Sequence, residues 1–217
     1  MIDKTFERWL VGFFEGDGYL RYGSHGKDYS VVNAVLAQKD VSVLEYVKDV
    51  LGYGNMNRRK DGVTNLQFWG KQRCLPILEG LVKYCVTKHK LAQLSDTLTK
   101  MGITAKPTLH APTLDWIVGF WDAEGSSSLT GPAHVVLNIN IVQADIEVLT
   151  SVRNFLGYGS IYTTKNNPPS GNAIHRLSFH NEHAYELAGV LLEKSKCLGK
   201  RTRLSDNLAI RALCLKR

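Results

Sequence analysis

The chain has 217 residues, of which 44% are hydrophobic and 22% are charged, and its formal net charge is +7 at pH 7. This composition is typical of a globular protein and excludes a disordered one, and no apolar run approaches the roughly 20 residues of a membrane span. Both halves of the chain are basic, which suits a surface that binds a polyanion, although many basic proteins bind none.

The N-terminus has no signal-peptide pattern, and the four cysteines (Cys74, Cys85, Cys197 and Cys214) have no metal-ligand spacing. Such usage indicates reduced thiols that serve as small buried side chains. We therefore expect an intracellular protein that is not secreted.

Hydrophobic periodicity and turn residues predict the elements of the first half. In chain order they are a helix at 5–15, strands at 19–22 and 31–38, a helix ending at Leu51, strands at 55–59 and 64–69, and helices from about 71, one of them at 89–101. Asp40 is the expected N-cap of the helix that Gly52 ends.

The second half predicts the same order of elements. They are a helix at 113–123, strands at 126–130 and 134–143, a helix at 145–156, strands at 160–164 and 174–179, and helices at 181–194 and 200–215. The expected domains are therefore 1–104 and 114–217, joined by a proline-containing linker at 105–113. Each half should form an α+β layer, with four antiparallel strands covered by helices on one face.

Matched sequence blocks indicate an internal duplication. Trp9–Gly18 (WLVGFFEGDG) corresponds to Trp116–Gly125 (WIVGFWDAEG). Three further pairs follow in the same order: Leu36–Leu44 with Ile141–Leu149, Val50–Gly54 with Phe155–Gly159, and Leu94–Leu98 with Leu204–Leu208. Four pairs in one order are very improbable by chance.

The best-matched pair predicts two closely packed helices that each end in an acid. Gly12 and Gly119 lie inside these helices, where a glycine costs roughly 1 kcal/mol, and close approach of two backbones would offset that cost. Asp17 and Glu124 lie at carboxyl ends, where the helix dipole disfavours an anion. The two acids would also repel each other if they lie close together. A divalent cation between them would relieve both unfavourable interactions, and oxygen ligands suit Mg²⁺. Glu15 and Asp122 should point to another face and be structural, as caps or ion-pair partners.

Alternating polar residues on the predicted strands indicate a solvent-facing sheet surface. We expect it either to be simply solvated or to read base edges in the DNA major groove while basic side chains contact phosphates. The candidate DNA-binding residues are Arg21, Tyr22, Lys27, Arg58, Arg59, Lys60, Asn138, Asn140, Lys165, His175 and Arg176.

The two motifs Leu10–Gly18 and Ile117–Gly125 resemble the two copies of the LAGLIDADG motif, and the whole chain resembles a single-chain, two-repeat LAGLIDADG homing endonuclease. The resemblance implies a DNA-binding saddle of two four-stranded sheets, with the motif helices at the interface. It also implies a monomer with internal pseudo-twofold symmetry, found in an organelle or in archaeal or bacterial cytoplasm. The second motif ends in Glu instead of Asp, so the two DNA strands should be cleaved at unequal rates.

The resemblance also implies roles for individual residues. Asp17 and Glu124 would bind the catalytic Mg²⁺, with the carbonyl groups of Gly16 and Ala123 as further ligands. Gln38 and Gln143, at the ends of the second strands, would position water or the scissile phosphate. Lys90 and Lys200 would offset charge on the phosphate, with Lys88 as an alternative to Lys90 and solvated surface charge as the alternative for all of them.

The expected activity is Mg²⁺-dependent hydrolysis of both strands of a long DNA site, with Mn²⁺ able to substitute and Ca²⁺ supporting binding without cleavage. The main alternative is an intron maturase, which binds intron RNA and aids splicing on the same scaffold. A DNA-binding regulator with an inactive site is a third hypothesis. The retained acids favour the nuclease, because a purely RNA-binding protein has no need of them.

Overall fold

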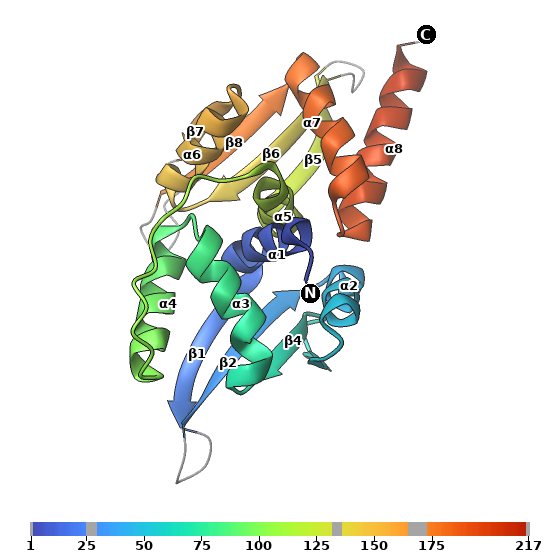
Figure 1. The fold of residues 1–217 in the computed structure, drawn as a ribbon. Helices are drawn as coiled ribbons and strands as arrows, with labels where there is room; N and C mark the ends of the chain where they lie inside the picture. The colour runs from blue at the N-terminus through green and yellow to red at the C-terminus, as the bar shows by residue number, and fades with distance from the viewer. Residues whose placement is uncertain (1, 25–29, 132–135, 165–172, 216–217) are drawn as a thin grey trace. The chain divides into compact units, whose positions relative to one another are not determined.

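A computed structural model describes residues 2–24, 30–131, 136–164 and 173–215 of the chain (Figure 1). The described chain divides into two compact units, Met1–Ala123 and Glu124–Arg217. The expected domains divide the chain at the linker between the two sequence repeats. The compact units divide it later, because the helix that contains the second motif packs within the first unit. None of the described helices is long and apolar enough to cross a membrane.

The first unit is an α+β layer in which helices cover one face of an antiparallel sheet (Figure 1). Its elements are α1 (Lys4–Asp17), β1 (Gly18–Ser24), β2 (Ser30–Gln38), α2 (Val41–Leu51), β3 (Asn55–Arg58), β4 (Thr64–Trp69), α3 (Lys71–Tyr84), α4 (Lys88–Lys100) and α5 (Leu114–Glu124), whose last residue opens the second unit. The strand order is β1-β2-β4-β3. Alternate residues such as Leu20, Leu36 and Phe68 are buried beneath the helices.

The second unit repeats this plan. Its elements are β5 (Gly125–Thr130), β6 (Val136–Gln143), α6 (Ile146–Leu156), β7 (Ser160–Thr164), β8 (Ile174–His180), α7 (Asn181–Lys194) and α8 (Leu198–Cys214). Its strand order, β5-β6-β8-β7, matches that of the first unit. Ile139, Ile141 and Phe179 form the buried side of the sheet. The expected fold class is confirmed for both halves.

The duplication extends to the helix caps. Asp40 accepts a hydrogen bond from the Ser42 N–H at the start of α2, and Asp145 accepts one from the Glu147 N–H at the start of α6. Both helices end at a glycine in the left-handed region, with φ of 77° at Gly52 and 82° at Gly157. The predicted Asp40 cap and Gly52 stop are therefore confirmed.

The cysteines form no disulfide, and Cys74, Cys85 and Cys197 are buried while Cys214 is half-buried. Burial raises the pKa of the Cys74 thiol to about 11 and also raises that of Cys85. The three buried thiols are therefore small apolar core groups, as expected.

Two helix glycines allow α1 and α5 to meet backbone to backbone. A Cβ placed on Gly12 would lie 2.0 Å from the carbonyl oxygen of Trp116, and one placed on Gly119 would lie 2.0 Å from the carbonyl oxygen of Trp9. The contact is reciprocal, because Trp9 and Trp116 occupy corresponding positions in the repeat. The predicted close packing of the motif helices is therefore confirmed.

This contact predicts that the two glycines are intolerant of any side chain. Gly12→Ala and Gly119→Ala should each lower the free energy of unfolding by about 3 kcal/mol, because a backbone atom must move to admit the methyl group. Urea denaturation followed by circular dichroism measures this change.

The matched control is Gly189→Ala in α7, where an added Cβ meets nothing within 4 Å. Since alanine favours a helix by roughly 1 kcal/mol over glycine, this variant should be more stable. Equal effects of the substitutions at Gly12 and Gly189 would contradict the close contact.

Candidate functional site

The two motif acids occupy the last residue of their helices. Asp17 ends α1 and Glu124 ends α5, and each is followed directly by the first residue of a strand. Both side chains are half-buried, and neither helix has a basic residue in its last turn. Each carboxylate therefore adds negative charge to a helix end that is already partly negative. Asp17 belongs to the first unit and Glu124 to the second, and their expected proximity stays a prediction.

In the first unit, Gln38 orients the carboxylate of Asp17. The Gln38 Nε2 group donates to Asp17 Oδ2 at 2.6 Å, and the Lys39 N–H donates to Gln38 Oε1 at 2.8 Å. A backbone N–H can only donate, so the amide oxygen must face Lys39 and the amide NH₂ must face the acid. This arrangement assigns the orientation of the glutamine side chain without ambiguity.

The second unit repeats the arrangement around Glu124. The Gln143 Nε2 group donates to Glu124 Oε1 at 3.2 Å, and the Ala144 N–H donates to Gln143 Oε1 at 2.8 Å. The strand register explains the match, because Gly18 pairs with Leu36 and Gly125 with Ile141, two residues before each glutamine. Each acid is thus placed by a helix end and oriented by the end of the neighbouring strand.

The other motif acids, Glu15 and Asp122, bind the opposite motif helix. Trp9 Nε1 donates to Asp122 Oδ2 at 2.9 Å, and Trp116 Nε1 donates to Glu15 Oε1 at 3.1 Å. Both carboxylates are buried. Burial raises the pKa of Glu15 above its usual value, while hydrogen bonds from Thr87 and its neighbours oppose the rise. In these contacts both acids act as acceptors that tie α1 to α5.

Of the candidate lysines, Lys90 of α4 places its ammonium group at the carboxyl end of α1. Its side chain is buried, and its ammonium group donates to the carbonyl oxygen of Gly18. Lys88, the alternative, is exposed two residues earlier. Lys200 is half-buried and is the third residue of α8, as Lys90 is of α4. The geometry therefore favours Lys90 over Lys88 as the lysine near the first acid.

The donor atoms at these helix ends suit a hard divalent cation. Gly16 and Ala123, whose carbonyl groups are the further candidate ligands, lie in the last turns of α1 and α5 beside the two acids. Carboxylate and carbonyl oxygens are the ligands that Mg²⁺ prefers. Within the described ranges, no group of three or more His, Cys, Asp or Glu side chains could hold a metal ion. A cation here would therefore need main-chain carbonyl oxygens beside each acid, and that set of oxygen donors fits Mg²⁺.

The face of the first sheet away from the helices carries the polar residues. Register and alternation place Arg21, which is exposed, on this face beside Asn33. Tyr22 follows Arg21 in the strand, so its side chain lies on the opposite, helix-covered face, where it is half-buried. Arg21 and Tyr22 thus lie on opposite faces of the sheet, and their expected DNA contacts stay predictions.

Further residues on this open face, four amides and two exposed aromatic residues, were not predicted. They are Tyr19, Asn55, Asn57, Asn65, Gln67 and Trp69. Their alternation with Met56, Leu66 and Phe68 was the signal that could have revealed them. Asparagine and glutamine amides can donate to and accept from a base edge at once, so this face has the chemistry for direct base readout.

In the second unit, Asn138, Asn140 and Arg176 lie on the corresponding open face. Arg176 is exposed, whereas Asn138 is buried and donates to Thr130, and Asn140 accepts from Ser178 at 2.7 Å. Both asparagines thus already make hydrogen bonds within the sheet, and their expected DNA contacts stay predictions.

His175 does not belong to this open face. It pairs with Gln143 in the register and lies on the same side as Leu177, and its Nδ1 atom lies 2.9 Å from Thr163 Oγ1. His175 is the cross-strand neighbour of Gln143, which orients Glu124, and its expected DNA contact stays a prediction.

The basic residues of the predicted hairpin tips have different settings. Arg58 is exposed at the end of β3, on the face of Met56, and Lys60 is exposed in the following turn. Arg59 forms a 2.8 Å ion pair with Asp61. Lys27 and Lys165 lie outside the described residues.

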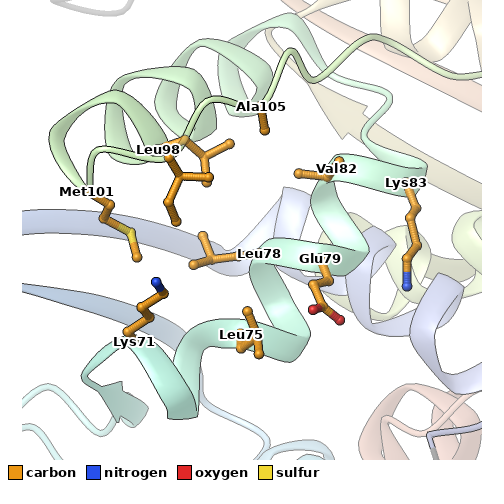
Figure 2. Close-up of a pocket in the computed structure, with 10 residues that line it drawn as sticks. Lys71, Leu75, Leu78, Glu79, Val82, Lys83, Leu98, Met101 and Ala105 are labelled. Atoms are coloured by element: carbon orange, nitrogen blue, oxygen red, sulfur yellow. The ribbon is translucent and has the colours of Figure 1, made fainter.

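A pocket of about 510 Å³ opens among α3, α4 and the segment that follows α4 (Figure 2). Leu78, Val82 and Leu98 form its apolar wall, and Lys71 lies at its edge beside Met101. Its lining contains none of the predicted site residues. The acids lie instead where helix ends meet strand ends.

The chain was compared with protein-family models and with solved structures. No protein-family model matches the chain. The LAGLIDADG meganuclease I-AabMI, solved bound to uncleaved DNA, matches with a TM-score of 0.70 and 16% identity over 97% of this chain and 91% of its own. The LAGLIDADG homing endonuclease I-LtrWI, bound to target DNA, matches with a TM-score of 0.74 and 13% identity over 99% and 92%.

A third structure, the LAGLIDADG homing endonuclease I-GzeII in complex with its DNA target, matches with a TM-score of 0.69 and 16% identity over 97% of this chain and 91% of its own. At such identities the likeness shows the fold and nothing finer. The resemblance carried by the two motifs is thereby confirmed for the architecture: the chain has the fold of the two-repeat LAGLIDADG homing endonucleases.

Proposed function

We propose that the protein is a site-specific homing endonuclease that makes a double-strand break in a long DNA target by Mg²⁺-dependent phosphodiester hydrolysis. The observation that carries this proposal is the acid–glutamine pair found in the same register in both units. The similar structures of homing endonucleases bound to target DNA support the choice of substrate. We further propose that the protein acts as a monomer, because one chain supplies both copies of the pair.

Asp17 and Glu124 would each hold a cation, joined by main-chain carbonyl oxygens at Gly16 and Ala123. Bound Mg²⁺ supplies a lowered pKa for a coordinated water and polarisation of the phosphate. Gln38 and Gln143 keep each carboxylate turned toward its site, and their amide groups can also direct water or the scissile phosphate. Lys90 and Lys200 offset negative charge that grows on the phosphate in the transition state.

The two sites differ in ways that should make the strand cleavage rates unequal. Glutamate has one more methylene group than aspartate, and its glutamine contact is 3.2 Å in the second unit against 2.6 Å in the first. The glutamine contact of Glu124 is therefore the longer of the two. We propose that the strand served by Glu124 is cleaved more slowly.

The open sheet faces would lie against the DNA. Their amides suit base edges, and Arg21 and Arg176 suit guanine or phosphate. An intron maturase would also use a basic polar surface, but RNA binding alone gives no purpose to two acids held by matching glutamines. The nuclease is therefore the better-supported proposal, and no described feature favours the maturase or a DNA-binding regulator over it.

The acids should be essential for cleavage and dispensable for binding. Asp17→Asn and Glu124→Gln should each lower double-strand cleavage with Mg²⁺ by at least about 10³-fold, since each removes a charged metal ligand. Affinity for the same DNA in Ca²⁺ should stay within a few-fold. The target is first selected from a randomised DNA library, and Asp49→Asn on the exposed side of α2 serves as the control. Full cutting by either acid variant would reject the assignment.

The glutamines should matter for rate. Gln38→Met and Gln143→Met keep the size of the side chain but remove the amide that orients each acid, and cleavage should slow by about 10–100-fold. Single-turnover assays with each DNA strand labelled separately would show which strand each glutamine serves. Gln72→Met, at an exposed position in α3, is the matched control and should cleave normally. Unchanged rates for both glutamine variants would count against an orienting role.

Basic side chains on the open sheet faces should account for much of the salt dependence of DNA affinity. Arg21→Ala and Arg176→Ala should each weaken DNA affinity and reduce the slope of log K against log salt by about 1 if the side chain contacts phosphate. Fluorescence anisotropy over a range of salt concentrations measures both quantities. Lys48→Ala, on exposed α2 behind the sheet, should leave the slope unchanged. A larger effect at Lys48 than at either arginine would place the DNA on another surface.

A further inference from the structure

The carboxylate of Glu15 gathers donors from two separate parts of the first unit. It accepts hydrogen bonds from the Val86 N–H at 2.8 Å and the Thr87 N–H at 2.6 Å, both in the link between α3 and α4. A third donor, Trp116 Nε1 on α5, lies at 3.1 Å. Glu15 is only 4% exposed, so these donors must offset the cost of burying the group.

The residues held by Glu15 define where α4 begins. Thr87 is the N-cap of α4, and its side-chain oxygen accepts from the Lys90 N–H at 3.4 Å. A carboxylate that fixes the Val86 and Thr87 backbone therefore fixes the first turn of this helix. Lys90 projects from that turn.

The side chain of Lys90 then returns to α1. Its ammonium group donates to the carbonyl oxygen of Gly18, the residue after Asp17, and lies 5.7 Å from the centre of the Phe14 ring. The contacts form a closed circuit from Glu15 through Thr87 and Lys90 back to the end of α1. One turn of α1 thus carries both the candidate metal ligand and the group that places the lysine beside it.

We propose that Glu15 is a positioning residue for Lys90, acting through the Val86–Thr87 backbone to hold the ammonium group at the end of α1. The inference rests on the proposed nuclease function for its effect on rate, but the placement of Lys90 can be measured without it. The motif acid two residues before the metal ligand therefore serves the same site indirectly, and does more than pack the helices together.

A purely structural role makes a different prediction. If Glu15 only tied α1 to α5, loss of its bond to Trp116 would matter as much as loss of its bonds to the α3–α4 link. Trp116→Phe removes one donor to the same carboxylate and leaves Val86 and Thr87 untouched. It is therefore the matched control for Glu15→Gln, which keeps the side chain's shape but places an NH₂ group against backbone N–H donors.

The first measurement is the chemical reactivity of Lys90 in the folded protein. A short pulse of acetic anhydride followed by mass spectrometry should label Lys90 about 10-fold faster in Glu15→Gln than in the wild type, since the loss of a hydrogen bond shifts a local opening equilibrium by roughly that factor. Labelling of exposed Lys48 on α2, away from the α3–α4 link, is the internal standard and should not change. Trp116→Phe should leave Lys90 protected. Equal protection of Lys90 in the wild type and Glu15→Gln, or equal exposure in both variants, would overturn the proposal.

The second measurement is a double-mutant cycle in single-turnover DNA cleavage. Glu15→Gln should slow cleavage by about 10–100-fold when Lys90 is present and by less than about 2-fold in a Lys90→Met background, with DNA affinity in Ca²⁺ unchanged. The same slowing in both backgrounds would show that Glu15 does not act through Lys90. If the wild type itself cleaves no DNA, the proposed function fails, and the labelling result alone still decides the role of Glu15.

Discussion

The packing of the two motif helices depends on the contact between the backbones of α1 and α5 at Gly12 and Gly119. An added methyl group at either glycine would meet a carbonyl oxygen at 2.0 Å, so hydrogen is the only substituent that fits. The approach brings Trp9 within hydrogen-bonding distance of Asp122, and Trp116 within that of Glu15. The same contact explains why the second motif helix packs with the first unit although the repeat assigns it to the second half.

The same acid–glutamine arrangement is found in both units, with a difference in the acid. In both, a helix ends at an acid, the chain enters a strand, and a glutamine at the end of the next strand donates to the acid while the following backbone N–H fixes its amide. Antiparallel register delivers the glutamine to the acid, so no long-range adjustment is needed. The change from Asp17 to Glu124 lengthens the side chain by one methylene group. If the carboxylate holds a metal ion, the cleavage rate would be sensitive to this difference.

Local patterns in the sequence were enough to predict most of the elements. Apolar spacing located β4, β7 and α7 at their observed bounds, and Asp40 and Gly52 marked the ends of α2, because capping and left-handed turns are decided by neighbouring residues. The partners of Glu15 lie 71 to 101 residues away, which no local pattern could reveal. Arg21 and Tyr22 were named together as candidates, but they lie on opposite faces because adjacent strand residues face opposite ways. The amides of Asn57 and Gln67 were overlooked although their alternation was visible.

The central claim is that each repeat ends its motif helix in a metal-binding carboxylate. Its most direct test is anomalous diffraction from crystals of the protein with its selected DNA target, grown in Mn²⁺. Our account predicts anomalous peaks bonded to a carboxylate oxygen of Asp17 and to one of Glu124, with the scissile phosphates as further ligands. Bound DNA with no metal at either acid, or with ions held only by other residues, would contradict it.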